Sequence, residues 1–238
     1  MIRLHDLCGR DPARRFSPYC WRVRLALAHK GLDHECLPWR FTERAAIADA
    51  GAGKVPVLRD DATGRVVHDS LRILEYLEEA HPDRPPLFGG PGGLALARFA
   101  TGWADAATVA AVARLVVSDI PRWLGEEDAA YFTRTREARF GMPLAEVTAG
   151  REARVGAFRR DTLAPLRAAL RRAPFLHGER PGAADYVAFG GFQWARMVSA
   201  FPLLDPADRA DPVHAWRARV LDLFDGLARD VPHEDATA

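Results

Sequence analysis

A run of thirteen residues, HPDRPPLFGGPGG from His81 to Gly93, contains four prolines and four glycines. Neither a helix nor a strand tolerates that density of proline and glycine, so the run is predicted to separate two folding units. The chain has 238 residues, which is long enough for two domains. We therefore expect a first domain over residues 1–84, a linker over 85–93 and a second domain over 94–238.

Before this run, strand patterns and helix patterns alternate. The segments IRLHDL and DHECLPW suit strands, and KVPVLRD and GRVVHD suit the two strands of a hairpin joined by the turn DDATG. Apolar residues recur at helical spacing from Pro18 to Lys30, and Gly31 ends that run. The segment DSLRILEYLEEAH places Leu71, Leu74 and Leu77 on one face of a second helix. The order strand, helix, strand, hairpin, helix predicts a small α/β domain.

After Leu94 the sequence shows no strand alternation. It is rich in Ala, Leu and Arg at helical spacing, and it is interrupted by short proline-containing segments such as IPRW, GMP and DPADRADP. We expect an all-helical second domain.

Charge and hydropathy exclude several classes of partner. Lys and Arg number 33 against 32 Asp and Glu, so the net charge of +1 gives no basic footprint for nucleic acid or an anionic membrane. The start MIRLHDL carries charged residues where a signal peptide needs an apolar run. The longest apolar stretches, such as AATVAAVA, are shorter than the roughly 20 residues of a membrane span. We expect a soluble, cytoplasmic protein with neither a nucleic-acid nor a membrane partner.

The cysteines and histidines predict no disulfide framework and no metal. Cys8, Cys20 and Cys36 cannot all pair and form no C-x-x-C motif, which favours a reducing compartment. The eight histidines include no H-E-x-x-H spacing, and HEC at His34–Cys36 is too short to be a metal site.

The segment RFSPYCWRVRLALAHKG places a hydroxyl at the start of the first helix. Pro18 fits the first turn, where its missing N–H costs nothing. Ser17 then lies at the positive end of the helix, beside backbone N–H groups that have no helical partner, and this location favours an anion. The alternative is an ordinary helix cap, because serine is a preferred cap residue.

Two further segments are consistent with a peptide-like ligand. In KVPVL, Pro56 between Val55 and Val57 suggests a cis bond that leaves the Val55 backbone free to pair with an extended ligand, or else an edge strand that tolerates proline. In HDSLRILEYL, Asp69 and Ser70 open a helix and form a second polar nest, or else only a cap. Together the three segments suit a peptide-like anion that carries a thiol.

The motifs FSPYCWRVRLALAHKG, KVPVL, VVHDSLRILEYLEEAHPDRPPLFGG and ERPGAADYVAFGGFQWAR resemble those of cytosolic glutathione S-transferases. Residues 1–80 resemble the thioredoxin-like half of that family, and the remainder resembles its all-helical half. The segment PWRFTE is similar to the bacterial β-etherase-like branch. The resemblance implies glutathione as cosubstrate, a hydrophobic small-molecule electrophile as second substrate, and a homodimer.

The resemblance also implies roles for single residues. Ser17 would be the catalytic residue and stabilise the glutathione thiolate. The Val55 backbone, before the cis Pro56, would pair with the cysteinyl part of glutathione. Lys54 and Arg40 would face the glycyl carboxylate.

At the other end of glutathione, Asp69 and Ser70 match the pair that holds the γ-glutamyl group. The chain departs from the family in the second domain, where Gly182 stands at the capping position before Asp185 in place of Ser or Thr. Glycine caps adequately, so we expect the helix to form. Cys20 lies one turn into the first helix, where we expect a buried, inert thiol.

The electrophile would lie against aromatic side chains of the helical domain, although each is also a candidate for ordinary core. These are Trp103, Trp123, Tyr131, Phe132 and Trp194. The resemblance to β-etherases suggests an aryl ether whose ether-bearing carbon lies next to a carbonyl.

Three functions stay open. The first is a glutathione transferase, in which the site lowers the thiol pKa from about 8.5 by about two units, equivalent to roughly 2.7 kcal/mol. The second is a thiol–disulfide oxidoreductase or isomerase, in which Cys20 works, or Cys8 with its pKa lowered by Arg10, Arg14 and Arg15. The third is a binding protein that holds glutathione and apolar ligands without turnover.

Overall fold

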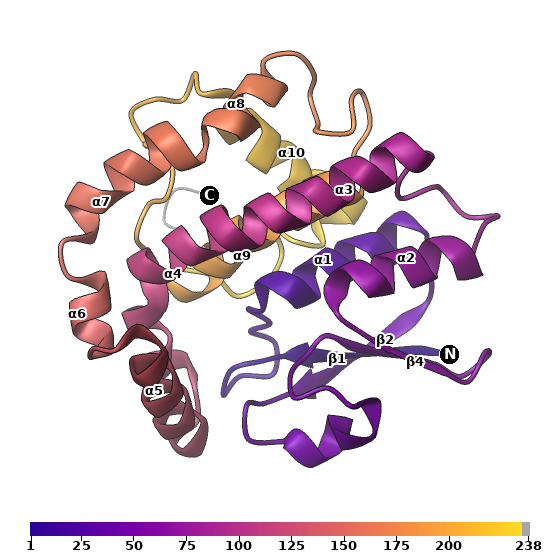
Figure 1. Ribbon diagram of the computed structural model, residues 1–238, viewed down its shortest axis with the longest axis horizontal. Coiled ribbons are helices and arrows are strands. Elements are labelled where there is room, and N and C mark those ends of the chain that lie inside the picture. The colour runs from indigo at the N-terminus through magenta and orange to yellow at the C-terminus, as the bar shows by residue number, and fades with distance from the viewer. Residues whose placement is uncertain (235–238) are drawn as a thin grey trace.

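The computed structural model describes residues 1–234, in which a small α/β unit precedes a helical one (Figure 1). This confirms the expected fold class. The elements of the first unit are β1 Ile2–Leu7, α1 Pro18–His29, β2 His34–Trp39, β3 Val57–Asp60, β4 Arg65–His68 and α2 Ser70–Ala80. The helices of the second unit are α3 Pro91–Trp103, α4 Ala110–Val116, α5 Glu126–Phe140, α6 Leu144–Thr148, α7 Arg151–Ala157, α8 Ala164–Leu170, α9 Ala183–Val198 and α10 Pro212–Gly226.

The four strands form one mixed sheet in the order β2-β1-β3-β4. β1 pairs in parallel with β2 and antiparallel with β3, and β3 pairs antiparallel with β4. Pro38 lies on β2 at the edge of the sheet, where a residue without an N–H is tolerated. All strands and the hairpin are as expected, except that β3 begins only at Val57, after Pro56.

Helix α1 belongs to the α/β unit and lies where that unit meets the helical unit. It packs against α2 on one side and α9 on the other, and Figure 1 shows α1 and α2 over the same face of the sheet. A helix covered on several sides needs apolar residues around most of its circumference. Accordingly Trp21, Val23, Leu25, Ala26 and Leu27 are all fully buried.

Helix α9 forms the centre of the helical unit and contacts α1, α3, α4 and α10. Its start is organised by Asp185, which is fully buried and accepts hydrogen bonds from the N–H groups of Leu176 (2.7 Å), His177 (3.3 Å) and Gly182 (3.1 Å) and from Trp216 Nε1 (2.9 Å). Gly182 has no side chain to return the bond, yet α9 begins at Ala183, as expected.

The connection between the two units lies a few residues before the linker expected over residues 85–93. α2 ends at Ala80 and α3 begins at Pro91, so residues 81–90 join them. Pro91 starts a helix inside the proline-rich run because proline is well placed in a first helical turn.

Several irregular helical segments have no counterpart in the sequence analysis, and two of them adjoin elements of the site. A 3-10 segment, Arg44–Ala50, separates β2 from β3, and a π-helical segment, Ala104–Val109, joins α3 to α4. Such π segments inside helices are frequent at functional sites. This one brings Asp105 and Val109 to the wall of the cavity described below.

Within residues 1–234, one helical run is long and apolar enough, by length and composition alone, to cross a membrane. It is Pro91–Asp119, whose most apolar part has a mean hydropathy of 1.2; Arg98, Asp105 and Arg114 divide it into the short apolar stretches that the sequence analysis describes. The run packs against α9 along one side, and 39% of its most apolar part is buried.

Candidate active site

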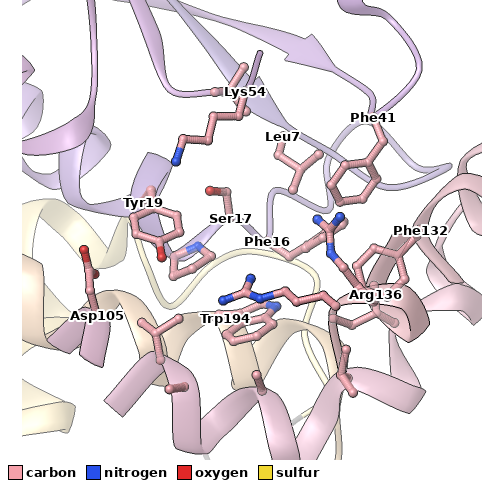
Figure 2. Close-up of a pocket in the computed structure, with 18 of the residues that line it drawn as sticks. Leu7, Phe16, Ser17, Tyr19, Phe41, Lys54, Asp105, Phe132, Arg136 and Trp194 are labelled. Carbon is pink, nitrogen blue, oxygen red and sulfur yellow. The ribbon is translucent and has the colours of Figure 1, made fainter. Parts of the chain in front are cut away.

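Ser17 caps α1 and faces a cavity between the two units. The side chain is 3% exposed, and its Oγ accepts a hydrogen bond from the Cys20 amide N–H at 3.2 Å. Capping uses a lone pair of the oxygen, so the hydroxyl proton stays available to donate. Figure 2 shows this oxygen directed into the space between Lys54 and Tyr19. The two interpretations of Ser17, as helix cap and as anion-stabilising group, are therefore compatible.

The first turn of α1 offers a second donor beside this hydroxyl. Pro18 has no N–H, and the amides of Cys20 and Trp21 donate to the side chain and the carbonyl of Ser17. Within residues 1–234 the N–H of Tyr19 has no hydrogen-bond partner. A free amide at the positive end of a helix attracts an anion.

The loop before β3 supplies the next wall of the site. Gly53, Lys54 and Val55 line the cavity, and the Val55–Pro56 peptide bond is cis, as the sequence suggested. The Val55 amide group pairs with no backbone group in the described part of the chain. Lys54 is exposed and, among the same residues, forms no ion pair.

Asp69 and Ser70 lie at the start of α2, outside the residues that line the cavity. Asp69 Oδ1 accepts from the N–H groups of Leu71 (3.0 Å) and Arg72 (3.2 Å), and its second oxygen is left for another partner. The residue has a positive φ of 74°, which non-glycine residues adopt rarely and which is common at functional sites. Ser70 is buried.

A buried arginine connects this second nest to the helical unit. Arg22 on α1 is 1% exposed; its Nη1 donates to Ser70 Oγ at 3.5 Å and its Nη2 to Asp105 Oδ1 at 2.6 Å. The guanidinium also lies 4.7 Å from the centre of the Tyr19 ring. Burial, followed by the charge of Asp105, raises the pKa of Tyr19, so its hydroxyl keeps its proton.

The cavity has a volume of about 540 Å³, which is within the range of small-molecule sites. Figure 2 shows Ser17, Lys54 and Leu7 on the side of the α/β unit and Trp194, Arg136 and Phe132 on the helical side. The aromatic wall consists of Phe16, Tyr19, Trp39, Phe41, Tyr131, Phe132, Phe140 and Trp194.

Helix α5, which carries much of this wall, is fastened to the α/β unit. The backbone N–H and the hydroxyl of Thr42 both donate to Asp128 Oδ1, at 3.0 and 2.9 Å. Arg44 Nη2 donates to the hydroxyl of Tyr131 at 2.5 Å. These contacts fix the distance between the two walls.

The structure brings together some of the expected pocket aromatics. Tyr131, Phe132 and Trp194 line the cavity, whereas Trp103 and Trp123 do not. Trp103 packs against the core, and Trp123 lies 3.7 Å from the Arg14 guanidinium and donates from Nε1 to the Val198 carbonyl at 2.9 Å. Both therefore have the ordinary structural role that the sequence left open.

Arg40 also lies away from the cavity lining. Its Nη1 donates to Glu43 Oε1 at 3.0 Å, and this bond raises the pKa of the guanidinium. A contact between Arg40 and a ligand carboxylate stays a prediction that the geometry does not favour.

The three thiols are unpaired and protonated at neutral pH. Cys8 and Cys20 are 0% exposed. Burial raises the pKa of Cys20 well above its ordinary value and that of Cys36 to about 11. The expectation that arginines lower the pKa of Cys8 is wrong in its net direction: burial raises that pKa, and Arg40 and Arg15 offset only part of the effect.

Sequence reasoning missed three arginines that line the cavity: Arg114, Arg136 and Arg139. Phe132, Arg136 and Phe140 are spaced by four residues and therefore share one face of α5. An arginine in the middle of an aromatic helical stripe was the signal available. Within residues 1–234, no three His, Cys, Asp or Glu side chains gather as a metal site.

Comparison with known proteins accounts for both halves of the chain. Residues 16–80 match the glutathione S-transferase N-terminal domain, and residues 95–201 match the glutathione S-transferase C-terminal domain. The crystal structure of a Ceriporiopsis subvermispora glutathione S-transferase in complex with glutathione has a similar fold, with a TM-score of 0.82, 24% identity and coverage of 97% of this chain and 98% of that one.

Two curated relatives match parts of the sequence. A glutathione S-transferase-like protein of Aspergillus flavus, ustS, is 32% identical over 69% of this chain and 58% of its own length. A probable maleylacetoacetate isomerase of Caenorhabditis elegans is 43% identical over 30% of this chain and 34% of its own length. The chain thus spans less than two thirds of either relative.

Proposed function

Because the chain belongs to the glutathione S-transferase family, we propose that it is a glutathione transferase in which Ser17 holds the thiol of bound glutathione as a thiolate. The family binds glutathione, and one structural neighbour was solved with it. The observation that carries the proposal is the geometry of Ser17. Its hydroxyl proton is free to donate, it faces the cavity, and the unpaired N–H of Tyr19 lies in the same helical turn.

The charged and polar residues of the α/β unit suit the two ends of a glutathione molecule. In the proposal, Lys54 binds the glycyl carboxylate, the Val55 backbone pairs with the cysteinyl unit, and Asp69 and Ser70 hold the γ-glutamyl group. The free oxygen of Asp69 is a suitable acceptor for an ammonium group. The sulfur then lies at the N-terminus of α1, facing the helical unit.

The chemical step is a displacement at carbon. The thiolate sulfur forms a bond to an electrophilic carbon, and the leaving group departs with the bonding electron pair. The protein orients the two reactants and stabilises the sulfur anion, so it forms no covalent bond itself. The raised pKa values of Cys8, Cys20 and Cys36 argue against a reaction that starts on a protein thiolate.

The finer proposal is cleavage of a β-aryl ether. A carbonyl next to the ether-bearing carbon activates that carbon, and a phenolate is a good leaving group. Support comes only from the similarity of segments such as PWRFTE to the β-etherase-like branch. The test is a panel in which glutathione is offered chloronitrobenzenes and β-aryl ethers, and conjugates and released phenol are measured separately. Turnover of neither class by the wild type would count against a transferase.

A second candidate is a glutathione-dependent isomerase, which the similarity to the C. elegans protein favours. That similarity covers only 30% of this chain and so bears on part of the molecule alone. In an isomerase, glutathione adds to the substrate and leaves again, so free glutathione is regenerated. Loss of glutathione in proportion to product identifies the transferase.

We also propose a homodimer that works in a reducing, cytoplasmic compartment. Phe99 on α3 is 70% exposed, which is unusual for a large apolar side chain, and a second copy of the chain would cover it. The three free thiols suit a reducing compartment. Light scattering should give a dimer for the wild type and a monomer for Phe99→Glu; a wild-type monomer would refute the dimer.

A further inference from the structure

Three arginines of the helical unit line the cavity that Ser17 faces. Arg136 and Arg139 come from α5 and Arg114 from α4. The Arg136 guanidinium lies 4.9 Å from the ring centre of Phe132 and 5.3 Å from that of Phe41, so aromatic rings flank it. The Arg114 guanidinium lies 5.5 Å from the ring centre of Phe140.

No carboxylate neutralises these three charges within residues 1–234. Several arginines elsewhere do pair with a carboxylate, as in Arg151 with Asp119 at 2.8 Å and Arg167 with Asp211 at 2.7 Å. Beside Arg136, however, Glu137 turns away and accepts from the Leu144 N–H at 3.0 Å. The acidic residue that lines the cavity, Asp105, is bonded to Arg22.

Arg136 is the most enclosed of the three. It is half-buried, and its Nη1 donates a hydrogen bond to Thr135 Oγ1 at 2.9 Å. Burial lowers the pKa of its guanidinium, and the neighbouring Arg139 adds to the effect. Partial burial of an uncompensated charge is costly, and it is common where a ligand supplies the counter-charge.

We propose that the second substrate is an aromatic electrophile that carries a carboxylate, which Arg136 binds, while the more exposed Arg139 and Arg114 line the same cavity. The proposal rests on the transferase function above and names its substrate class. A guanidinium matches a carboxylate through two parallel hydrogen bonds, and the flanking rings stack on an aromatic body. The residues assigned to glutathione itself all belong to the α/β unit, whereas the three arginines belong to the helical unit.

A matched pair of probes isolates the carboxylate. 4-Chloro-3-nitrobenzoate and 4-chloro-3-nitrobenzamide differ in one substituent of similar size, which is an anionic carboxylate in the first and a neutral carboxamide in the second. With either probe, the thiolate sulfur bonds to the chlorine-bearing carbon, the electron pair is held by the nitroarene ring, and the C–Cl bond then breaks to release chloride. Each kcat/KM is divided by the rate constant of the same reaction without enzyme, which corrects for the intrinsic reactivity of the probe.

The wild type should prefer the benzoate over the benzamide by at least tenfold on this scale. Arg136→Gln should reduce the value for the benzoate at least tenfold more than that for the benzamide. Arg134→Gln is the control, because Arg134 lies on the same helix, is exposed and does not line the cavity. Equal use of both probes by the wild type, or a preference that survives Arg136→Gln and Arg139→Gln, would overturn the proposal.

Calorimetry separates this proposal from the transferase function. With the glutathione site filled by S-methylglutathione, which has no nucleophilic thiol, the benzoate should bind at least tenfold more tightly than the benzamide. Arg136→Gln should abolish that difference and leave the affinity for S-methylglutathione unchanged. An equal loss of S-methylglutathione affinity would assign Arg136 to glutathione and refute the inference. A benzoate preference without turnover of either probe would refute the transferase function alone.

Discussion

Arg22 of α1 and Asp105 of the π-helical segment form an ion pair across the junction of the two units, with Nη2 and Oδ1 at 2.6 Å. The arginine is 1% exposed and also reaches Ser70, so one guanidinium links the proposed γ-glutamyl site to the cavity wall. Through this contact, Arg22 fixes the position of the helical unit relative to Ser70 at the start of α2.

Asp105→Asn should destabilise the protein by about 1–3 kcal/mol, because it leaves the buried Arg22 without its counter-charge; the 41% exposure of Asp105 keeps the loss below that of a fully buried pair. The KM for glutathione should rise as Ser70 is released. Glu75→Gln, which breaks the surface pair with Arg98, should cost less than about 1 kcal/mol. Chemical denaturation of the three proteins checks this, and equal losses would contradict the role of Arg22.

Gly190→Ala should destabilise the protein, although alanine favours helix interiors over glycine by about 1 kcal/mol. A Cβ on Gly190 would lie 2.3 Å from the carbonyl oxygen of Pro18, so α9 must move away from the start of α1. Gly191→Ala is the matched control, since its Cβ would meet side-chain methyl groups alone, those of Thr108 at 3.3 Å and Val109 at 3.8 Å. Urea unfolding should show Gly190→Ala as the less stable variant, and the reverse order would refute this account of the α1–α9 contact.

The cysteines should be unreactive in the folded protein. With the pKa of Cys36 at about 11, only about 0.1% of that thiol is ionised at pH 8, against roughly a quarter of a free thiol. Labelling by iodoacetamide should therefore be at least about 100-fold slower than labelling of free cysteine. Cys8→Ala and Cys20→Ala should keep glutathione transfer. A folded Cys8→Ala variant without turnover would instead support a thiol-based reaction.

Stability should fall as the pH drops below about 6.5, in part through His29. Burial lowers the pKa of His29 below that ordinary value, and the ring contacts the Tyr186 hydroxyl at 2.6 Å and the Pro86 carbonyl at 3.2 Å. The unfolded chain therefore takes up the proton first as the pH falls, which favours unfolding. His29→Gln should weaken the dependence of the free energy of unfolding on pH between 6.5 and 5. An unchanged slope would exclude this role.

The sequence predicted the elements of the α/β unit well because each is determined locally. Alternation defined β1 and β2, the turn DDATG defined the hairpin, and Pro18 and Gly31 bounded α1. The same local signals identified Ser17, since a capping serine before a helix-starting proline is visible without a fold.

Pairing across the two units could not be predicted from such signals. Asp105 is a site residue only because a π-helical segment turns it toward Arg22, which is 83 positions away. Trp103 and Trp123 were reasonable candidates by composition, but packing in the interior excluded both from the cavity wall. The charge of the pocket was missed because it depends on which arginines lack an acidic neighbour.

The thiol pKa of bound glutathione is the most direct test of the role of Ser17. Titration of the thiolate absorbance in the complex should give a pKa about two units below the value of about 8.5 for a free thiol. Ser17→Ala should raise the thiol pKa most of the way back to the free value and lower turnover at pH 7 by an order of magnitude or more. The lost helix cap should lower the free energy of unfolding by about 1 kcal/mol. Ser70→Ala should weaken glutathione binding and leave the thiol pKa low. A wild-type complex with an unshifted pKa, or a Ser17→Ala complex that keeps the low value, would contradict the account.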